Sequence, residues 1–179
     1  MSYYQRTLPH WHPDGAPVVL TWRLFGSLPA PARDSCPIQP GRAFVLMDRR
    51  LDRADFGPQW LRDDRIARCT INAFYFGQNE LKLYKLYSYV IMPNHVHILL
   101  QPGTPLARIT KSIKGYTARE ANLLLNRTGS PFWQYESYDH WVRNERELHK
   151  ITAYSENNPV SAGFVNHPED WPWSSAHVE

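Results

Sequence analysis

Two histidines in alternate positions of an apolar segment, His95 and His97, are the residues best suited to chemistry. If this segment is a strand, both side chains leave the same face about 6.6 Å apart along the chain, so two imidazoles can bind one metal ion. Imidazoles in an apolar strand cost desolvation free energy unless they have partners. Because structural zinc sites usually have four protein ligands, two histidines favour an open site with a third protein ligand and metal-assisted chemistry.

A tyrosine and an asparagine one helical turn apart, Tyr154 and Asn158, could complete such a site. Residues at i and i+4 share a helix face, so the Asn158 amide oxygen is a candidate third ligand. A phenol can act as a nucleophile, but it titrates near pH ~10 and would need a nearby cation. Packing in the core is the competing interpretation for Tyr154. It is the preferred one for Tyr116, which falls on an apolar helical stripe.

The middle of the chain is basic. The chain has 20 basic and 17 acidic side chains, a net charge of +3, but residues 81–127 have seven basic side chains and one acidic, a net charge of +6. A basic segment suggests a polyanionic partner, and a solvated helix face is the alternative. The candidate phosphate contacts are Arg108, Lys111, Lys114 and Arg119.

Length and composition predict one globular domain over residues 1–179, with 42% apolar and 21% charged residues. No segment approaches the roughly 18 apolar residues of a membrane span, and the first residues lack the apolar core of a signal peptide. We therefore expect a cytoplasmic protein without a membrane partner. Cys36 and Cys69 lack metal-site or disulfide-framework spacing, so reduced thiols are expected.

Strands and helices alternate along the chain. Apolar, β-branched and aromatic runs predict strands at 18–25, 83–92, 95–101 and within 131–143, and Pro93 and Asn94 favour a tight hairpin turn. Helices are predicted at 58–78 and 104–126, and from the cap residue Asn144 to Asn157 or Asn158. An irregular entry (1–17), a loop (29–42) and a C-terminal tail (164–179) complete the chain. This order predicts an α+β domain with an antiparallel sheet and helices on one face, most simply ferredoxin-like.

Five blocks of sequence resemble a known family. VIMPNHVHILLQP resembles the HUH signature (His, hydrophobic, His) of single-tyrosine transposases. IKGYTAREAN, GSPFWQYESYDHWVRNERE, YSENNPVSAGFV and PEDWPWSSA follow in the order seen in REP-associated tyrosine transposases, bacterial relatives of the small insertion-sequence transposases. The resemblance extends from about residue 18 to the end.

The resemblance implies a ferredoxin-like HUH fold with Mg²⁺ or Mn²⁺ at the histidine pair. It implies cleavage and rejoining of single-stranded DNA beside hairpins or palindromic repeats, through a tyrosine joined to the 5′ phosphate. Tyr154 matches the family's nucleophile, and His95, His97 and Asn158 match its metal ligands. A monomer or a homodimer is expected, associated with the nucleoid when bound to DNA. Ser155 and Glu156 depart from the family's usual apolar residues, which bears on how this helix packs.

Two other functions remain open at this point. A DNA-binding protein without catalysis would still bind repeats, but the full set of His95, His97, Tyr154 and Asn158 argues against this. A small metallohydrolase would use the same histidines, but the basic segment and the absence of an H-E-x-x-H motif argue against that. Only the transposase would become covalently attached to DNA.

Overall fold

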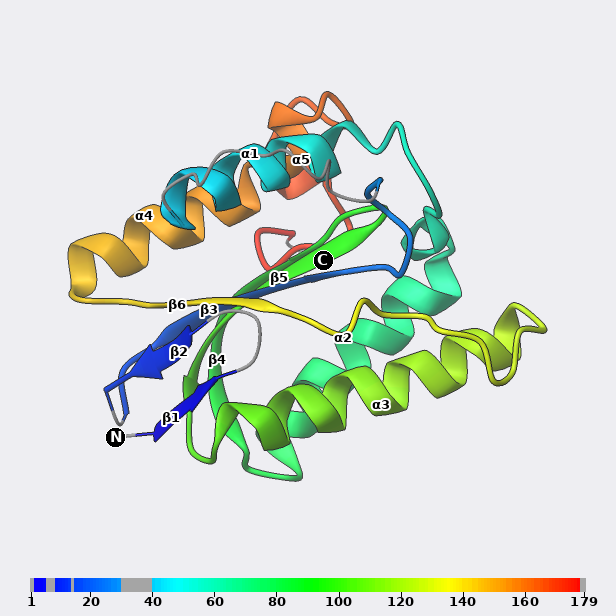
Figure 1. Cartoon of the computed structure of the whole chain (residues 1–179). Coiled ribbons are helices and arrows are strands. Elements are labelled where there is room, and N and C mark those ends of the chain that lie inside the picture. Colours follow the sequence, from blue (N-terminus) through cyan, green and yellow to red (C-terminus); the bar gives the residue numbers. More distant parts are fainter. Residues whose placement is uncertain (1, 6–8, 14, 30–39, 178–179) are drawn as a thin grey trace.

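The computed structural model describes residues 2–5, 9–13, 15–29 and 40–177. Its helices and strands, in chain order, are β1 (Ser2–Gln5), β2 (Pro9–His12), β3 (Val18–Arg23), α1 (Pro40–Arg53), η1 (Trp60–Arg62), α2 (Asp64–Asn79), β4 (Tyr84–Ile91), β5 (His95–Pro102), α3 (Leu106–Leu124), β6 (Tyr138–Trp141), α4 (Glu145–Glu156), α5 (Asn158–Ser161) and η2 (Pro168–Asp170). Figure 1 shows their arrangement.

The main sheet has four antiparallel strands in the order β4-β5-β3-β6. With α2 between β3 and β4, and α3 between β5 and β6, the chain follows the β-α-β-β-α-β path of a ferredoxin-like unit. The predicted hairpin connects β4 and β5, where the Met92 amide donates to the carbonyl oxygen of His95 at 2.9 Å. The α+β class and the antiparallel sheet are therefore confirmed.

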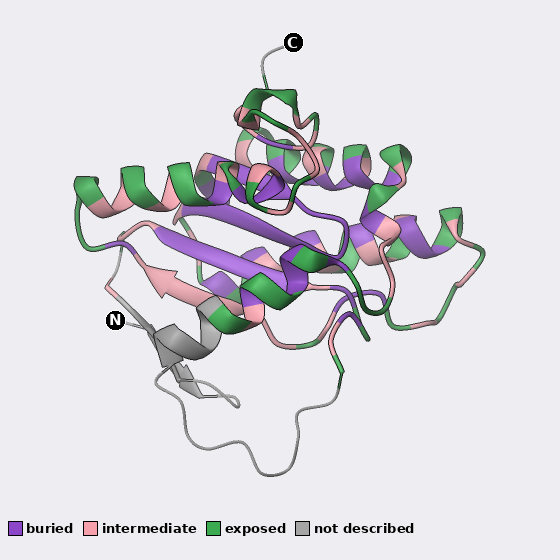
Figure 2. Ribbon diagram, turned by 90° about the horizontal axis from the view of Figure 1, so that it is seen from above, coloured by how far each residue is buried: buried purple, intermediate pink, exposed green. Residues whose placement is uncertain are grey.

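Helices cover both faces of this sheet, whereas the sequence predicted helices on one face. The larger core lies between the sheet and α2 and α3, and includes Trp22, Ile98, Phe74 and Ile113. The other face carries a smaller apolar cluster under α4, and α1 lies beside α4 on this side (Figure 1). This second face is itself apolar at Val19 and Leu99, so it also needs cover. The central strands β3 and β5 are buried except at their C-terminal ends (Figure 2).

Several boundaries differ from the predicted ones for local reasons. The first helix of the ferredoxin-like unit begins at Asp64 rather than at Pro58, because the Asp63 carboxylate accepts the Arg65 amide as an N-cap. Residues 40–53, for which no element was predicted, form α1. The predicted cap of α4 is confirmed, since Asn144 Oδ1 accepts the Glu147 amide at 2.9 Å.

The two terminal segments are more ordered than predicted. Within 1–17, β1 and β2 pair as a two-stranded antiparallel sheet. Near the C-terminus, the Ile91 amide donates to Trp173 O and the Ser175 amide donates to Tyr89 O, so the tail covers the edge of β4. Cys69 is a free thiol, whereas Cys36 lies outside the described residues. Within the described ranges, no helix has the length and apolar character needed to cross a membrane.

Candidate active site

The histidine pair lies on the face of β5 that α1 and α4 cover. Both side chains are buried, and their Nε2 atoms are 3.1 Å apart. The intervening Val96 and the following Ile98 point into the larger core. The alternation expected of a strand is therefore present, with chemistry on one face and packing on the other.

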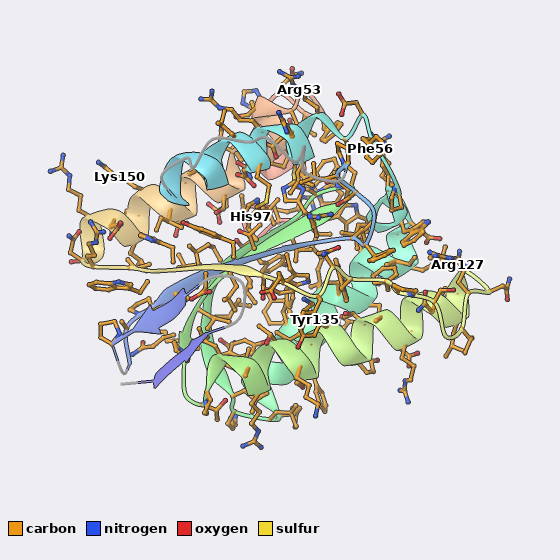
Figure 3. The ribbon with its side chains drawn as sticks, in the orientation of Figure 1. Arg53, Phe56, His97, Arg127, Tyr135 and Lys150 are labelled. Carbon is orange, nitrogen blue, oxygen red and sulfur yellow. The ribbon has the colours of Figure 1, made fainter. Side chains whose placement is uncertain are left out.

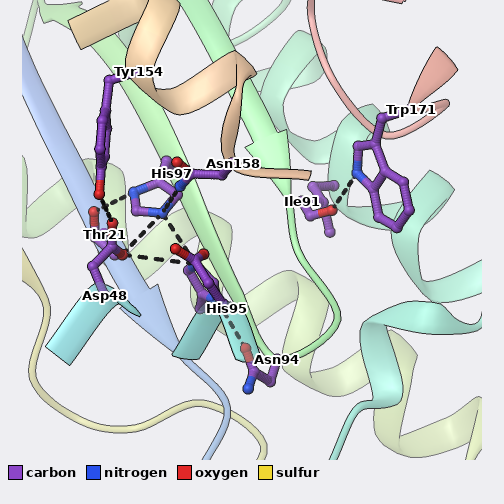
Figure 4. A network of polar contacts seen from close by, with 10 residues as sticks. Thr21, Asp48, Ile91, Asn94, His95, His97, Tyr154, Asn158 and Trp171 are labelled. Carbon is purple, nitrogen blue, oxygen red and sulfur yellow. Dashed lines mark hydrogen bonds and ion pairs between the residues drawn. The ribbon is translucent and has the colours of Figure 1, made fainter. Parts of the chain in front are cut away.

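A hydrogen bond to Nδ1 orients each imidazole. His95 Nδ1 lies 2.7 Å from Asn94 Oδ1, and His97 Nδ1 lies 2.7 Å from Thr21 Oγ1. Because an amide oxygen only accepts, His95 carries its proton on Nδ1 and leaves the Nε2 lone pair free. Such partners fix the ring orientation of metal-binding histidines, and here both Nε2 atoms converge on one point (Figure 4).

Asn158 and Tyr154 reach the same point from the C-terminal helices. Asn158 is buried, and its Nδ2 lies 3.0 Å from His97 Nε2. It does not continue α4 as predicted, because α4 ends at Glu156 and Asn158 opens the short helix α5, with Pro159 in its first turn. The side chain still reaches the histidines, so the structure brings together all four residues that the sequence predicted.

Asp48 of α1 is a fifth member that the sequence analysis missed. Its carboxylate is fully buried, and Oδ1 lies 3.2 Å from His97 Nε2 and 3.8 Å from His95 Nε2. Oδ2 accepts a hydrogen bond of 2.7 Å from the Tyr154 hydroxyl. One carboxylate therefore contacts both the histidine pair and the tyrosine (Figure 4). A signal was available in the sequence, since Asp48 and Asp52 lie one helical turn apart around an apolar Leu51.

This donor set fits a divalent cation. Ligands of an octahedral Mg²⁺ at about 2.1 Å lie about 3.0 Å from one another, and the separations of 3.0 to 3.2 Å around His97 Nε2 match this. One ligand atom from each of Asp48, His95 and His97 lies within 4.8 Å of the others. Asp48 Oδ1 is buried and has no hydrogen-bond donor among the described residues, which is what a carboxylate oxygen reserved for a cation would show.

Burial and charge shift the pKa values of the two acids in opposite directions. Burial raises the pKa of Asp48, but the two histidines and the Tyr154 hydroxyl outweigh it and hold this pKa at about 2. Burial and the Asp48 charge raise the pKa of Asp52 to about 7. Burial also lowers the pKa of His95, so its ring is neutral at pH 7. The site therefore presents a carboxylate and a neutral imidazole, the forms that bind metals.

Tyr154 is neutral in the same environment. Its ring is 45% exposed, and burial together with the Asp48 charge raises the pKa of its hydroxyl above the ordinary value. Asp48 stabilises the phenol by accepting its proton in a hydrogen bond. Nucleophilic attack by Tyr154 therefore requires that this proton be transferred to an acceptor.

We expect Asp52→Asn to stabilise the metal-free protein above pH 7. The Asp52 pKa is raised on folding, so its contribution to the free energy of unfolding falls as pH rises from about 4 to about 7. The asparagine variant should gain about 1–3 kcal/mol at pH 8 and much less at pH 4. Thermal unfolding in a chelator measures this, with the exposed Asp55→Asn as control. Equal gains at both pH values would contradict the assignment.

The predicted phosphate contacts are on the opposite side of the sheet. Arg108, Lys111, Lys114 and Arg119 belong to α3, which packs with α2 and the larger core. The Lys114 ammonium donates to the carbonyl oxygens of Gln134 and Tyr135 at 2.7 and 2.9 Å, so it supports the chain leading to β6. Arg119 pairs with Glu120 at 2.8 Å, while Arg108 and Lys111 are exposed.

The family described as "Transposase IS200 like" matches residues 65–158, just over half of the chain. The chain belongs to this family. The match includes the histidine pair, Tyr154 and Asn158, whereas α1 and Asp48 precede it in this IS200-like transposase.

Two curated relatives agree with the resemblance seen in the sequence. A protein named as a REP-associated tyrosine transposase of Haemophilus influenzae is 28% identical over 105 residues, 49% of this chain and 56% of the relative. The REP-associated tyrosine transposase of Escherichia coli is 25% identical over 97 residues, 52% of this chain and 55% of the relative. The matches thus span about half the length of these curated relatives.

A solved structure shows the same fold. The structure of a REP-associated tyrosine transposase bound to a REP hairpin superposes with a TM-score of 0.59, over 99% of this chain and 84% of that one, at 19% identity. The resemblance to REP-associated tyrosine transposases and the expected fold are therefore confirmed for this IS200-like transposase.

Proposed function

We propose that this transposase is a divalent-metal-dependent endonuclease and strand transferase of single-stranded DNA. Its substrate is a hairpin formed by a palindromic repeat, and its intermediate is a 5′-phosphotyrosine. The observation that carries the proposal is the convergence of the Tyr154 hydroxyl, both histidine Nε2 atoms and the buried Asp48 carboxylate. A metal site and a nucleophile held by one shared carboxylate suit phosphoryl transfer.

His95, His97, Asp48 and Asn158 would hold the metal, which when bound supplies positive charge to a scissile phosphate. Asn158 contributes its amide oxygen, which requires the amide orientation opposite to that in Figure 4, a rotation that exchanges two atoms of similar size. Asn94 and Thr21 keep the two imidazoles in place. The buried strand β5 fixes both histidines before substrate arrives.

Tyr154 carries out the substitution. Its oxygen forms a bond to the phosphorus while the bond from phosphorus to the upstream 3′ oxygen breaks. The phenolic proton passes through Asp48 Oδ2, 2.7 Å away, to solvent, because a carboxyl group with a pKa of about 2 does not retain it. The 3′ oxygen leaves and takes up a proton from solvent. Because the phosphotyrosine bond conserves the energy of the broken bond, a 3′-hydroxyl can later displace the tyrosine without ATP.

A hairpin partner is supported by two independent observations. One solved structural neighbour is a REP-associated tyrosine transposase bound to a REP hairpin. In this chain, Arg108 and Lys111 are exposed on α3, where they can contact the backbone phosphates of a stem. A non-catalytic repeat-binding protein would need exposed basic residues such as Arg108 and Lys111, but it would not need the buried cluster around Tyr154.

A covalent-adduct assay tests the function. Labelled single-stranded oligonucleotides, each with one palindrome from the DNA next to the coding region and unpaired flanks, are incubated with protein and Mn²⁺ and then denatured. We expect a labelled band at the protein's mass plus that of one cleaved strand, and none in a chelator. Binding without this band would instead support the non-catalytic alternative.

Asp48→Asn should weaken Mn²⁺ binding by at least about tenfold, as loss of a charged ligand does. Adduct formation should be slower even at saturating Mn²⁺, because asparagine cannot accept the Tyr154 proton. Calorimetric titration with Mn²⁺ and the adduct rate measure the two effects. The control is Asp55→Asn, an exposed acid just after α1. An unchanged Mn²⁺ affinity would remove Asp48 from the ligand set.

A further inference from the structure

A cleft of about 430 Å³ lies beside Tyr154, between α1 and the C-terminal helices. Its lining residues are Arg49, Asp52, Arg53, Tyr154, Asn158, Ser161 and Ala162. Three of them belong to α1, and the rest belong to α4 and α5 or follow α5 directly. The cleft is thus bounded by both the nucleophile and the proposed third metal ligand.

Two arginines give this cleft its charge. Arg49 and Arg53 are exposed, and neither forms an ion pair within the described part of the chain. They are one helical turn apart, about 6 Å along the axis of α1. Asp52 is the acid that faces them, and it is mostly buried on the side of His95, 3.6 Å from its Nε2. Both guanidinium groups are therefore available to an anion, because among the described residues no carboxylate forms an ion pair with either of them.

We propose that this cleft binds two consecutive backbone phosphates of the scissile strand, with Arg49 at the scissile phosphate and Arg53 at its neighbour. The inference rests on the proposed function and names how its substrate is held. A guanidinium binds a phosphate through two parallel hydrogen bonds. The axial separation of the two arginines is comparable with that between successive phosphates of one strand.

The position of Arg49 distinguishes its role from that of Arg53. Arg49 directly follows Asp48, whose carboxylate binds the Tyr154 hydroxyl, and both Arg49 and Tyr154 line the cleft, so a phosphate bound by Arg49 is placed beside the attacking oxygen. Arg53, one turn further along α1, lies at its outer end (Figure 3). Small side chains on the facing wall, Ser161 and Ala162, leave room for the strand between the helices.

The unpaired flank of the hairpin, rather than its stem, would occupy the cleft. Arg108 and Lys111 project from α3 on the other face of the sheet. The two basic groups therefore serve different parts of one substrate, with the stem at α3 and the scissile flank at α1. Loss of the α3 residues should therefore weaken binding of the stem, whereas loss of the α1 arginines should weaken binding of the flank.

The test compares Arg49→Ala and Arg53→Ala with Arg50→Ala, a matched control on the exposed surface of the same helix but outside the cleft lining. At saturating Mn²⁺ and oligonucleotide, Arg49→Ala should slow adduct formation by about 10- to 100-fold, the effect of a lost charged hydrogen bond. Arg53→Ala should weaken binding of the flanked hairpin by about tenfold and leave binding of the same hairpin without flanks unchanged. Arg50→Ala should match wild type in both assays.

A neutral linkage locates the contact. Oligonucleotides with one methylphosphonate, placed on either side of the scissile phosphate, lose the charge at a single position. Wild type should bind one of them about tenfold more weakly, and on that oligonucleotide Arg53→Ala should cause no further loss.

The outcomes separate this inference from the proposed function. If wild type forms the adduct while Arg49→Ala and Arg53→Ala behave as Arg50→Ala does, the cleft does not hold the strand and the proposed function stands. If wild type forms no adduct, the proposed catalysis fails, and the binding of the flanked hairpin then tests the cleft by itself. Weaker binding in Arg53→Ala would support the cleft as the site of the strand. Unchanged binding in Arg53→Ala would overturn it.

Discussion

Replacing Tyr154 by phenylalanine should abolish the covalent adduct, with a loss of at least about 10³-fold, as removal of a nucleophile does in other enzymes. The substitution removes one oxygen and keeps a ring that is 45% exposed, so the cost to packing is small. Asp48 loses the donor to Oδ2, but Oδ1 and the histidines are unchanged. Mn²⁺ binding and hairpin binding should therefore persist, as measured by titration and by band shift.

Tyr116→Phe is the matched control. Tyr116 is equally exposed, at 47%, but it belongs to α3, where it lines an apolar groove with Phe76 and Leu81. The Arg119 guanidinium carbon lies over its ring, 5.9 Å from the ring centroid. This variant should form the adduct at the wild-type rate. If the adduct band persists in Tyr154→Phe and disappears in Tyr116→Phe, the nucleophile is on α3 and our assignment to α4 is wrong.

The sequence predicted those elements whose signals are local. The hairpin of β4 and β5 follows from two apolar runs separated by Pro93 and Asn94, and the helix α4 follows from the cap at Asn144. The alternation of His95 and His97 with core residues determines which face of β5 carries chemistry. These features depend on the periodicity of side chains along a strand or helix, which is the same in the sequence and in the folded chain.

Asp48 could not be placed by the same reasoning, because its role depends on where α1 docks. Residues 40–53 are rich in charge, and their arginines interrupt the apolar pattern that would indicate a helix. The carboxylate becomes a partner of His97 and Tyr154 only when α1 packs against α4 and α5. The spacing of Asp48 and Asp52 marks an acidic pair on one helix face, but it does not indicate which distant residues that pair contacts.

The same limit explains Lys114 and Glu156. On a helical projection Lys114 lies off the apolar stripe, yet its ammonium binds two carbonyl oxygens of the segment before β6. Glu156 stands where the family usually has an apolar residue, and its carboxylate accepts a hydrogen bond of 2.7 Å from Ser175 in the tail that covers β4. Glu156, which replaces the family's usual apolar residue, thus connects α4 to the C-terminal segment by a hydrogen bond.

Replacing either His95 or His97 by alanine should abolish strand cleavage while hairpin binding stays within about tenfold, or roughly 1.4 kcal/mol. Each histidine contributes an Nε2 atom to the point where four donor groups converge, and an alanine leaves Asp48 with less compensating charge. In the proposed mechanism a metal held there would stabilise the charge on the phosphate in the transition state, whereas basic side chains would hold the rest of the DNA. Adduct formation and band shift measure the two effects separately.

The control for this pair is His149→Ala, a histidine on the exposed side of α4, 76% exposed and 3.9 Å from Glu145. It should cleave and bind as wild type does. Because the two active-site histidines are buried, thermal unfolding of each variant shows whether the fold is retained, and His97→Asn offers a smaller cavity if the alanine variant unfolds. Cleavage that survives the loss of both histidines in a folded protein would exclude the metal site, and Asp48 would then serve Tyr154 alone.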